Sequence, residues 1–320
     1  MRRRVLLATS IVSLSSGARA QTPERLRKVG VLMDGTPPHP SPDVLSAVLK
    51  ERGWIEGRTI SFDVRFAGGQ PALGAEQAAE LVRSEVDVIA AHFTPSVRAA
   101  MAATKTLPIV MAPAGAPVEA GLVASLSRPG GNVTGVTNMA AELGGRRLQL
   151  LKDTIPSLGR VAVLASSQDA FTRPFLAYLD VAAQSGGLQL DPVPIAGPAD
   201  FESAFAAMAE RRAGAVIIQG VFNSYRSAII DLARRHRIPT MWFDRQAILA
   251  GGLISLSANT DDIYRRAAVM LDKILKGAKP GDLPVEQPSI FELVINLQTA
   301  RAYGLTVPQS VQVQADELIE

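Results

Sequence analysis

Four short polar side chains and one aromatic ring follow two early apolar runs of the chain, at positions where a small solute could be held. They are Asp34 and Thr36 after the first run, and Phe93, Thr94 and Ser96 after a later one. In open parallel sheets, ligands bind beyond the carboxyl ends of the strands, where loops and helix N-termini converge. We therefore predict that these five residues contact a ligand.

The second half of the chain repeats this pattern. Ser166, Ser167, Phe222 and Asp244 follow later apolar runs, and Thr137 ends a segment that is expected to cross between two lobes. Hydroxyls, an aromatic ring and a carboxylate together suit a small polar or amphipathic solute. We predict that these residues face the first group across a cleft.

Thr94 and Ser96 flank the start of an expected helix and indicate which chemical group they would bind. Free N–H groups and the positive end of the helix dipole favour an anion there. We expect a solute carboxylate at this point, with Phe93 or Phe222 packing against its apolar part and Asp244 meeting a donor group. Both hydroxyls are expected in an exposed loop.

Residues for catalysis or metal binding do not form a recognisable set. Cysteine is absent, and no G-x-S-x-G, G-x-x-x-x-G-K-[ST] or G-x-G-x-x-G motif occurs. His39, His92 and His236 are far apart in sequence, although His92 follows an expected strand and could line a pocket. Asp261 and Asp262 begin an expected helix, where acidic residues complement the dipole. We expect no enzyme, no metal and no cofactor.

Strands and helices alternate along the chain in units of roughly 30 residues, which indicates parallel sheets with right-handed crossovers. The strands are expected at 29–33, 59–66, 86–90, 107–111, 160–165, 188–193, 215–219, 239–243 and 291–297, with helices between most of them. Glycine and proline interrupt this alternation near 128–135, and a Gly-Gly pair precedes 253–257. Both segments are expected to cross between lobes.

The predicted fold class is α/β, with two Rossmann-like lobes of parallel sheet joined by a multi-strand hinge. Lobe 1 is expected to comprise residues 27–136 and 257–285, and lobe 2 residues 137–256 and 286–320. Crossing segments of this kind leave room for the lobes to close on a ligand.

The first 20 residues have the features of an export signal. Three arginines precede an apolar stretch at 5–14, and Ala18-Arg19-Ala20 forms a small-x-small cleavage site before Gln21. A frayed N-terminal helix is the alternative. No cysteine follows the site, so no lipid anchor is expected.

The charge of the chain depends on this segment. The whole chain has 33 basic and 30 acidic residues, which gives a net charge of +3. Four of the basic residues are arginines within residues 1–20, so residues 21–320 alone have a net charge of −1. This balance argues against a nucleic-acid partner. We expect a periplasmic monomer that binds a small molecule.

Several longer motifs resemble the substrate-binding proteins of ABC importers called the tryptophan/tyrosine type. The matching segments are 53–58, 116–135, 274–277 with Pro280, 283–288, 291–297 and 315–320. The resemblance runs from about residue 27 to the C-terminus. It implies a type I periplasmic binding fold, closure of two lobes on the ligand, and delivery to a permease and an ATPase at the inner membrane.

Two motifs depart from the family pattern. Ala116-Pro117-Val118 stands where relatives commonly have Asp-Pro-Val, and Ser255-Leu256-Ser257 where many have Ser-Tyr-Gly. The identity of the solute therefore stays open, with an aromatic or branched amino acid or related acid as the expectation. A periplasmic sensor that feeds a membrane receptor is the alternative, because it would use the same fold and cleft.

Overall fold

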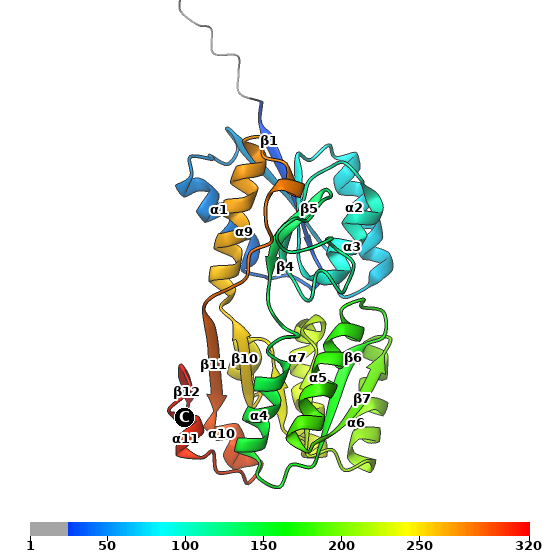
Figure 1. Ribbon diagram of the computed structural model, residues 1–320, viewed down its shortest axis with the longest axis vertical. Coiled ribbons are helices and arrows are strands. Elements are labelled where there is room, and N and C mark those ends of the chain that lie inside the picture. The colour runs from blue at the N-terminus through cyan, green and yellow to red at the C-terminus, as the bar shows by residue number, and fades with distance from the viewer. Residues whose placement is uncertain (1–24) are drawn as a thin grey trace, which may run out of the picture.

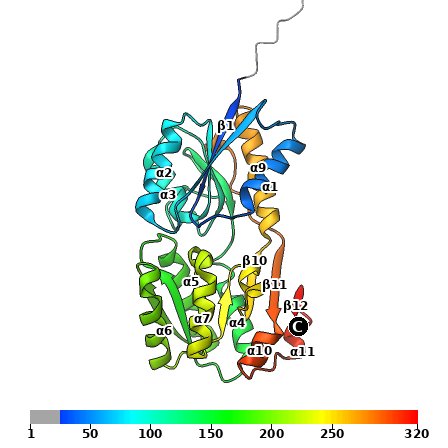
Figure 2. The ribbon, with the colours of Figure 1, turned by 180° about the vertical axis from the view of Figure 1, so that it is seen from behind.

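The computed structural model describes residues 25–320, so the predicted export signal lies outside the described residues. Two α/β lobes follow one another along the long axis of the molecule (Figure 1). The C-terminus lies on the second lobe, as both ribbon views show (Figures 1 and 2). Within the described part, no helix is both long and apolar enough to cross a membrane.

Lobe 1 is built on a five-stranded parallel sheet with the order β2-β1-β3-β4-β5. Its strands are β1 (Arg27–Met33), β2 (Ile60–Phe66), β3 (Val88–Ala91), β4 (Ile109–Ala114) and β5 (Val133–Thr137). Its helices are α1 (Ser41–Glu51), α2 (Pro71–Arg83), α3 (Phe93–Ala103) and α9 (Thr260–Leu275).

Helices cover both faces of the lobe 1 sheet, α1 and α9 on one face and α2 and α3 on the other (Figures 1 and 2). Successive strand residues point to opposite faces. Val29 and Val31 therefore pack in the core beneath α1 and α9, whereas Leu32 packs beneath α2 and α3. Burial on both faces explains why the strands are apolar without alternation.

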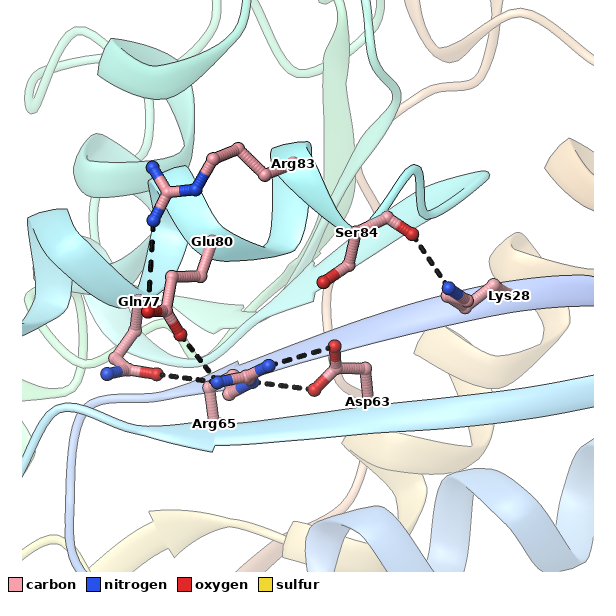
Figure 3. Close-up of polar contacts among 7 residues, drawn as sticks. All are labelled: Lys28, Asp63, Arg65, Gln77, Glu80, Arg83 and Ser84. Atoms are coloured by element: carbon pink, nitrogen blue, oxygen red, sulfur yellow. Dashed lines mark hydrogen bonds and ion pairs between the residues drawn. The ribbon is translucent and has the colours of Figure 1, made fainter.

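Polar contacts tie the edge strand β2 to α2 on the outside of lobe 1 (Figure 3). The Arg65 guanidinium donates to Asp63 Oδ1 at 2.6 Å and to Glu80 Oε2 at 2.6 Å, and Arg83 lies 3.8 Å from Glu80. Lys28 Nζ donates to the backbone oxygen of Ser84 at 2.7 Å. Each charged group in this network has a partner.

Lobe 2 is built on a seven-stranded sheet with the order β12-β11-β10-β9-β8-β6-β7. Its strands are β6 (Arg160–Ser166), β7 (Gln189–Ile195), β8 (Ala215–Ile218), β9 (Thr240–Trp242), β10 (Ile254–Ala258), β11 (Phe291–Asn296) and β12 (Glu317–Ile319). Its helices are α4 (Gly144–Thr154), α5 (Thr172–Gly186), α6 (Phe201–Glu210), α7 (Arg226–His236), α8 (Arg245–Leu249), α10 (Leu297–Ala302) and α11 (Gln309–Gln312).

The predicted α/β class with two mostly parallel sheets is confirmed, with one difference in lobe 2. Strands β10 and β11 are antiparallel, because the chain leaves lobe 2 along β10 and returns along β11. The short elements α8, α10, α11 and β12 have no counterpart in the sequence prediction.

The chain passes between the lobes at three places within the described residues. It leaves lobe 1 after β5, returns after β10 and leaves again before β11. The segments 133–137 and 253–257, expected to be the crossings, are largely strands β5 and β10, each paired within one sheet. The crossings follow these strands, at 138–143 and near Asn259.

Candidate functional site

A cavity of about 490 Å³ lies between the two lobes. Loops after β1, β3 and β5 line it from lobe 1, and the segments after β8, β9 and β10 complete the wall. The carboxyl ends of parallel strands therefore meet there, as the sequence predicts. The volume lies in the range of small-molecule sites, roughly 300–1,000 Å³.

A smaller cavity of about 40 Å³ adjoins the first. The two share wall residues, among them Phe93, Asn138 and Phe243. Thr94 from lobe 1 and Asp169 from lobe 2 line the smaller cavity. A ligand in the main cavity could therefore place a small polar group between these two side chains.

The lobes touch at the rim of the main cavity. Tyr225 Oη of lobe 2 donates to the backbone oxygen of Gly68 at 2.8 Å, and Ser224 Oγ accepts from Thr36 N at 3.4 Å. A Cβ at position 35 would lie 2.5 Å from Ser224 Oγ, so the glycine permits this close approach. The structure therefore has the lobes in contact around the cavity.

Two buried carboxylates from opposite lobes belong to these cavities. Asp34 follows β1 and is 6% exposed; burial and the negative charge of Asp169 raise its pKa to about 7. Asp169 follows β6 and accepts from Phe171 N and Gln219 Nε2, both at 2.9 Å. Burial raises the pKa of Asp169 to about 6.

Phe93 brings its ring to the cleft through an unusual backbone conformation. Its φ is +64°, a left-handed value that is rare and strained for a bulky side chain. The ring lines both cavities and lies 3.5 Å from where a Cβ of Gly220 in lobe 2 would be. Strain of this kind persists where the surrounding structure enforces it, and it accumulates at ligand sites.

Two histidines extend the aromatic wall beside Phe93. The ring centroids of His39 and His92 are 4.9 Å apart, and the His92 ring also lies 3.9 Å from that of Phe93. Burial and then the positive charge of Arg226 lower the pKa of His39 to about 4, and burial holds the pKa of His92 well below its usual value. Both rings are therefore neutral at pH 7.

Arg147 of α4 is a buried cation at the cavity wall, only 1% exposed. Its Nε and Nη2 donate to the Leu256 oxygen of β10 at 3.0 and 2.8 Å, and its Nη1 donates to the Ala140 oxygen at 2.6 Å. Its Cζ lies 3.6 Å from the centroid of the Phe243 ring. One side chain therefore joins the first connection between the lobes and strand β10 to an aromatic residue of the cavity.

The start of α3 differs from the expectation of an exposed loop. Thr94 and Ser96 are the second and fourth residues of α3, 2% and 1% exposed, so the expectation that they lie at the surface is wrong. The N-cap residue His92 provides no side-chain cap for the helix. Thr94 lines the smaller cavity, whereas Ser96 Oγ is buried without a hydrogen-bond partner and lines neither cavity.

Asp244 and Arg245 have separate roles at the lobe 2 wall. Asp244 caps α8 by accepting from Gln246 N at 3.0 Å, and burial raises its pKa. Arg245 donates to both carboxylate oxygens of Glu317, at 2.7 and 2.8 Å, which occupies its guanidinium.

The predicted site residues fall into two groups. Five line a cavity: Asp34, Thr36, Phe93, Thr94 and Asp244. Five lie outside both cavity walls: Ser96, Thr137, Ser166, Ser167 and Phe222.

Local contacts account for most of the second group. Thr137 Oγ1 accepts from Met139 N in a turn, and Ser167 Oγ donates to the Ile195 oxygen. Ser166 Oγ accepts from Gln168 N. The Phe222 ring packs in the lobe 2 core, 5.5 Å from that of Phe201.

Sequence reasoning missed several wall residues. Asp169 lies only two positions beyond the predicted Ser166-Ser167 pair, so a wider window after the strand would have included it. Arg147 and Tyr264 lie within helices, and nothing in the periodicity of a helix marks a residue that reaches a cleft. Within residues 25–320, no cluster of three or more His, Cys, Asp or Glu side chains could hold a metal ion.

Known proteins of similar sequence and structure bind aromatic amino acids. The chain is 25% identical over 272 residues to a tyrosine-binding protein of Clostridioides difficile, covering 83% of this chain and 78% of the relative. A Streptococcus pneumonia ABC domain in complex with L-Trp is 27% identical, with a TM-score of 0.85, and the match covers 92% of this chain and all of that one.

Two further comparisons agree with these. A conserved domain protein of Vibrio cholerae is 29% identical, with a TM-score of 0.85, over 92% of this chain and 100% of that chain. Residues 42–319 match the family model described as ABC transporter substrate binding protein. The chain therefore belongs to the family of ABC transporter substrate-binding proteins.

Proposed function

We propose that this protein is the periplasmic solute-binding component of an ABC importer and captures an aromatic or branched amino acid, or a related acid. It would close on the solute between its lobes and pass it to a permease and an ATPase at the inner membrane. The observation that carries the proposal is the interlobe cavity, which has aromatic walls and the N-terminus of α3 at one end.

The N-terminus of α3 would hold the carboxylate of the solute. The first N–H groups of a helix have no partner within the helix, and the dipole favours an anion there. The N-cap residue His92 leaves them free, and the Thr94 hydroxyl lies at the adjoining cavity wall. Arg226 of the main cavity is the competing anchor, because it pairs with no carboxylate of the described residues.

The rings along the cavity would bind the apolar part of the solute. Phe93, Phe243 and the neutral His39 and His92 form a surface that suits a flat or branched side chain. The tyrosine-binding relative and the neighbour with bound L-Trp support an aromatic solute.

A ligand screen tests the proposal. Residues 21–320 would be purified and screened by thermal shift against amino acids and against aromatic acids without an amino group. A ligand at 100 times its Kd stabilises the folded protein by about 2.7 kcal/mol, which gives a clear shift in Tm. The proposal fails if no amino acid or related acid raises the Tm while a sugar does.

Two further measurements test export and transport. N-terminal sequencing of the protein, purified from the periplasm of the cells that produce it, should give a sequence that begins at or near Gln21. A deletion strain should lose uptake of the solute that the screen identifies. Normal uptake in that strain, with altered signalling instead, would favour the sensor alternative.

A further inference from the structure

Asp34 and Asp169 form a pair that the folded chain leaves uncompensated. They come from loops on opposite lobes, one after β1 and one after β6, and each lines one of two adjoining cavities. Both are more than nine-tenths buried, at 6% and 7% exposed. Burial of a carboxylate is unfavourable unless a cation or several donors compensate it.

Asp34 lacks such compensation. Its carboxylate accepts no hydrogen bond from any residue between 25 and 320, and the charge that acts on it is that of Asp169. Asp169 receives two neutral donors, Phe171 N and Gln219 Nε2, which fix its orientation but do not neutralise it. None of the ion pairs among the described residues includes either carboxylate.

The other charged groups nearby do not supply the missing cation. Arg98 is close enough to lower the pKa of Asp169, but its Nη1 donates to the Ala120 oxygen. Arg226 donates to the Asn223 oxygen, and its charge acts on His39 and Asp244. Tyr225 is neutral, since burial and the Asp34 charge raise its pKa.

A third acceptor lies in the same wall. Asn223 Oδ1 is buried without a hydrogen-bond partner and belongs to the residues that line the main cavity. Asn223 precedes Ser224, whose hydroxyl contacts the Asp34–Thr36 loop through Thr36 N. This side of the cleft therefore has acceptors from both lobes, and neither the Asp34 carboxylate nor Asn223 Oδ1 receives a hydrogen bond from the described residues.

We propose that Asp34 and Asp169 bind a protonated amine of the ligand, which bridges the two lobes. A primary ammonium has three N–H donors and one positive charge, so it can serve both carboxylates and a further acceptor such as Asn223 Oδ1. This inference rests on the proposed function and narrows its substrate class. With a carboxylate at α3, the ligand is an α-amino acid zwitterion, and an aromatic acid without an amine is a poor ligand.

The same pair makes closure depend on the ligand. Without an amine, two like charges from opposite lobes are brought together in a buried site as the lobes close. With an ammonium group between them, each carboxylate is attracted to the positive charge of the ligand, and this attraction offsets the repulsion between the carboxylates. The amine therefore stabilises the closed arrangement in addition to being bound by it.

Matched ligands test the site. Isothermal titration would compare L-tyrosine with 3-(4-hydroxyphenyl)propanoate, which lacks the amine, and with tyramine, which lacks the carboxylate. L-Tryptophan and indole-3-propanoate form a second pair. The acids should bind at least about tenfold more weakly than the amino acids, because a hydrogen-bonded charge is lost. Equal affinity of acid and amino acid would overturn the proposal.

Matched variants test the residues. Asp34→Asn and Asp169→Asn should each weaken L-tyrosine binding by about tenfold or more. They should also reduce the ratio between the Kd of 3-(4-hydroxyphenyl)propanoate and the Kd of L-tyrosine. Glu202→Gln is the control, because Glu202 pairs with Arg235 on the surface of lobe 2. If both variants still bind L-tyrosine more tightly than 3-(4-hydroxyphenyl)propanoate by the same factor as the wild type does, the amine is bound by other residues.

A ligand-free measurement separates this inference from the proposed function. If the carboxylates repel each other, Asp34→Asn should melt at a higher temperature than the wild type without any ligand, whereas Glu202→Gln should not. If no amino acid binds the wild type, the proposed function fails and the melting test still judges the pair. If Asp34→Asn melts at no higher temperature than the wild type, the inference that Asp34 and Asp169 repel each other in the ligand-free protein is wrong.

Discussion

Charged side chains are arranged in opposite ways on the outer edge of lobe 1 and in the cleft. On the outer edge, Arg65 binds Asp63 and Glu80, and each charge has a partner (Figure 3). In the cleft, Asp34 and Asp169 line adjoining cavities, and the described residues form no ion pair with either carboxylate. The charges of the outer edge are paired within the chain, whereas the two cleft carboxylates are unpaired and, in our proposal, bind the ligand.

The pH dependence of binding should show the largest effect of this difference. The pKa of Asp34 is about 7 and that of Asp169 about 6, both above the ordinary value of 3.8. An ammonium needs the ionised forms. The affinity for L-tyrosine should therefore rise about a hundredfold between pH 5 and pH 8 from Asp34 alone, as measured by isothermal titration.

The contribution of Asp34 and Asp169 to the stability of the ligand-free protein should change in the opposite direction. A raised pKa means that the folded state keeps a proton that the unfolded chain has lost, so the part of the free energy of unfolding that depends on these two carboxylates falls as the pH rises from about 4 to about 7. His39 and His92 contribute with the opposite sign, because their lowered pKa values mean that the unfolded chain binds protons there that the folded state does not. The carboxylate contribution is therefore measured as the difference in the free energy of unfolding between the wild type and Asp34→Asn at each pH. If the affinity for L-tyrosine does not change between pH 5 and pH 8, the cleft carboxylates do not bind the ligand in their ionised forms.

The carboxylate end of the ligand predicts the next largest effect. Thr94→Val keeps the size of a side chain that is 2% exposed but removes its hydroxyl. A hydrogen bond to a charged group contributes about 1.5–3 kcal/mol, so affinity should fall about ten- to a hundredfold in titration.

Ser96→Ala is the matched control for Thr94→Val. Ser96 Oγ has no partner and lines neither cavity, so its loss should leave affinity nearly unchanged. Normal binding by Thr94→Val together with weak binding by Arg226→Gln would move the carboxylate from α3 to Arg226.

The same contrast explains how much could be predicted from the sequence. Apolar runs and helix signals are local, so they predicted the two sheets and the cleft between them. The ends of strands also predicted Asp34, Phe93 and Asp244, since chain order alone places them at the carboxyl edge.

The rest of the site depends on contacts that are distant in sequence. Arg147 reaches Leu256 across 109 positions, and the pairing of Asp34 with Asp169 requires the lobes to meet. From the sequence, Phe222 is predicted to contact the ligand because it follows a strand. Its ring instead packs against that of Phe201 in the lobe 2 core. Position after a strand does not determine which way a side chain points.

The Arg65 network should affect stability without affecting binding. Exposed pairs contribute about 0.2–1 kcal/mol each, so loss of the two Arg65 pairs in Arg65→Gln should lower the free energy of unfolding by about 0.4–2 kcal/mol. Urea denaturation would measure this loss, and titration with L-tyrosine should give the wild-type affinity. A large loss of affinity would show that the network and the cleft are coupled, which the comparison denies.

The smallest effect concerns the contact between the lobes. Tyr225 Oη donates to the Gly68 oxygen at 2.8 Å, and this bond exists only while the lobes touch. A net hydrogen bond contributes about 0.5–1.5 kcal/mol, so Tyr225→Phe should weaken ligand binding about two- to tenfold. Tyr178→Phe is the matched control, because Tyr178 Oη meets Glu119 Oε1 at 3.4 Å in an exposed contact. Since a long, hydrated contact contributes little, Tyr178→Phe should bind normally, and equal losses in both variants would mean that the effect does not come from the Gly68 bond.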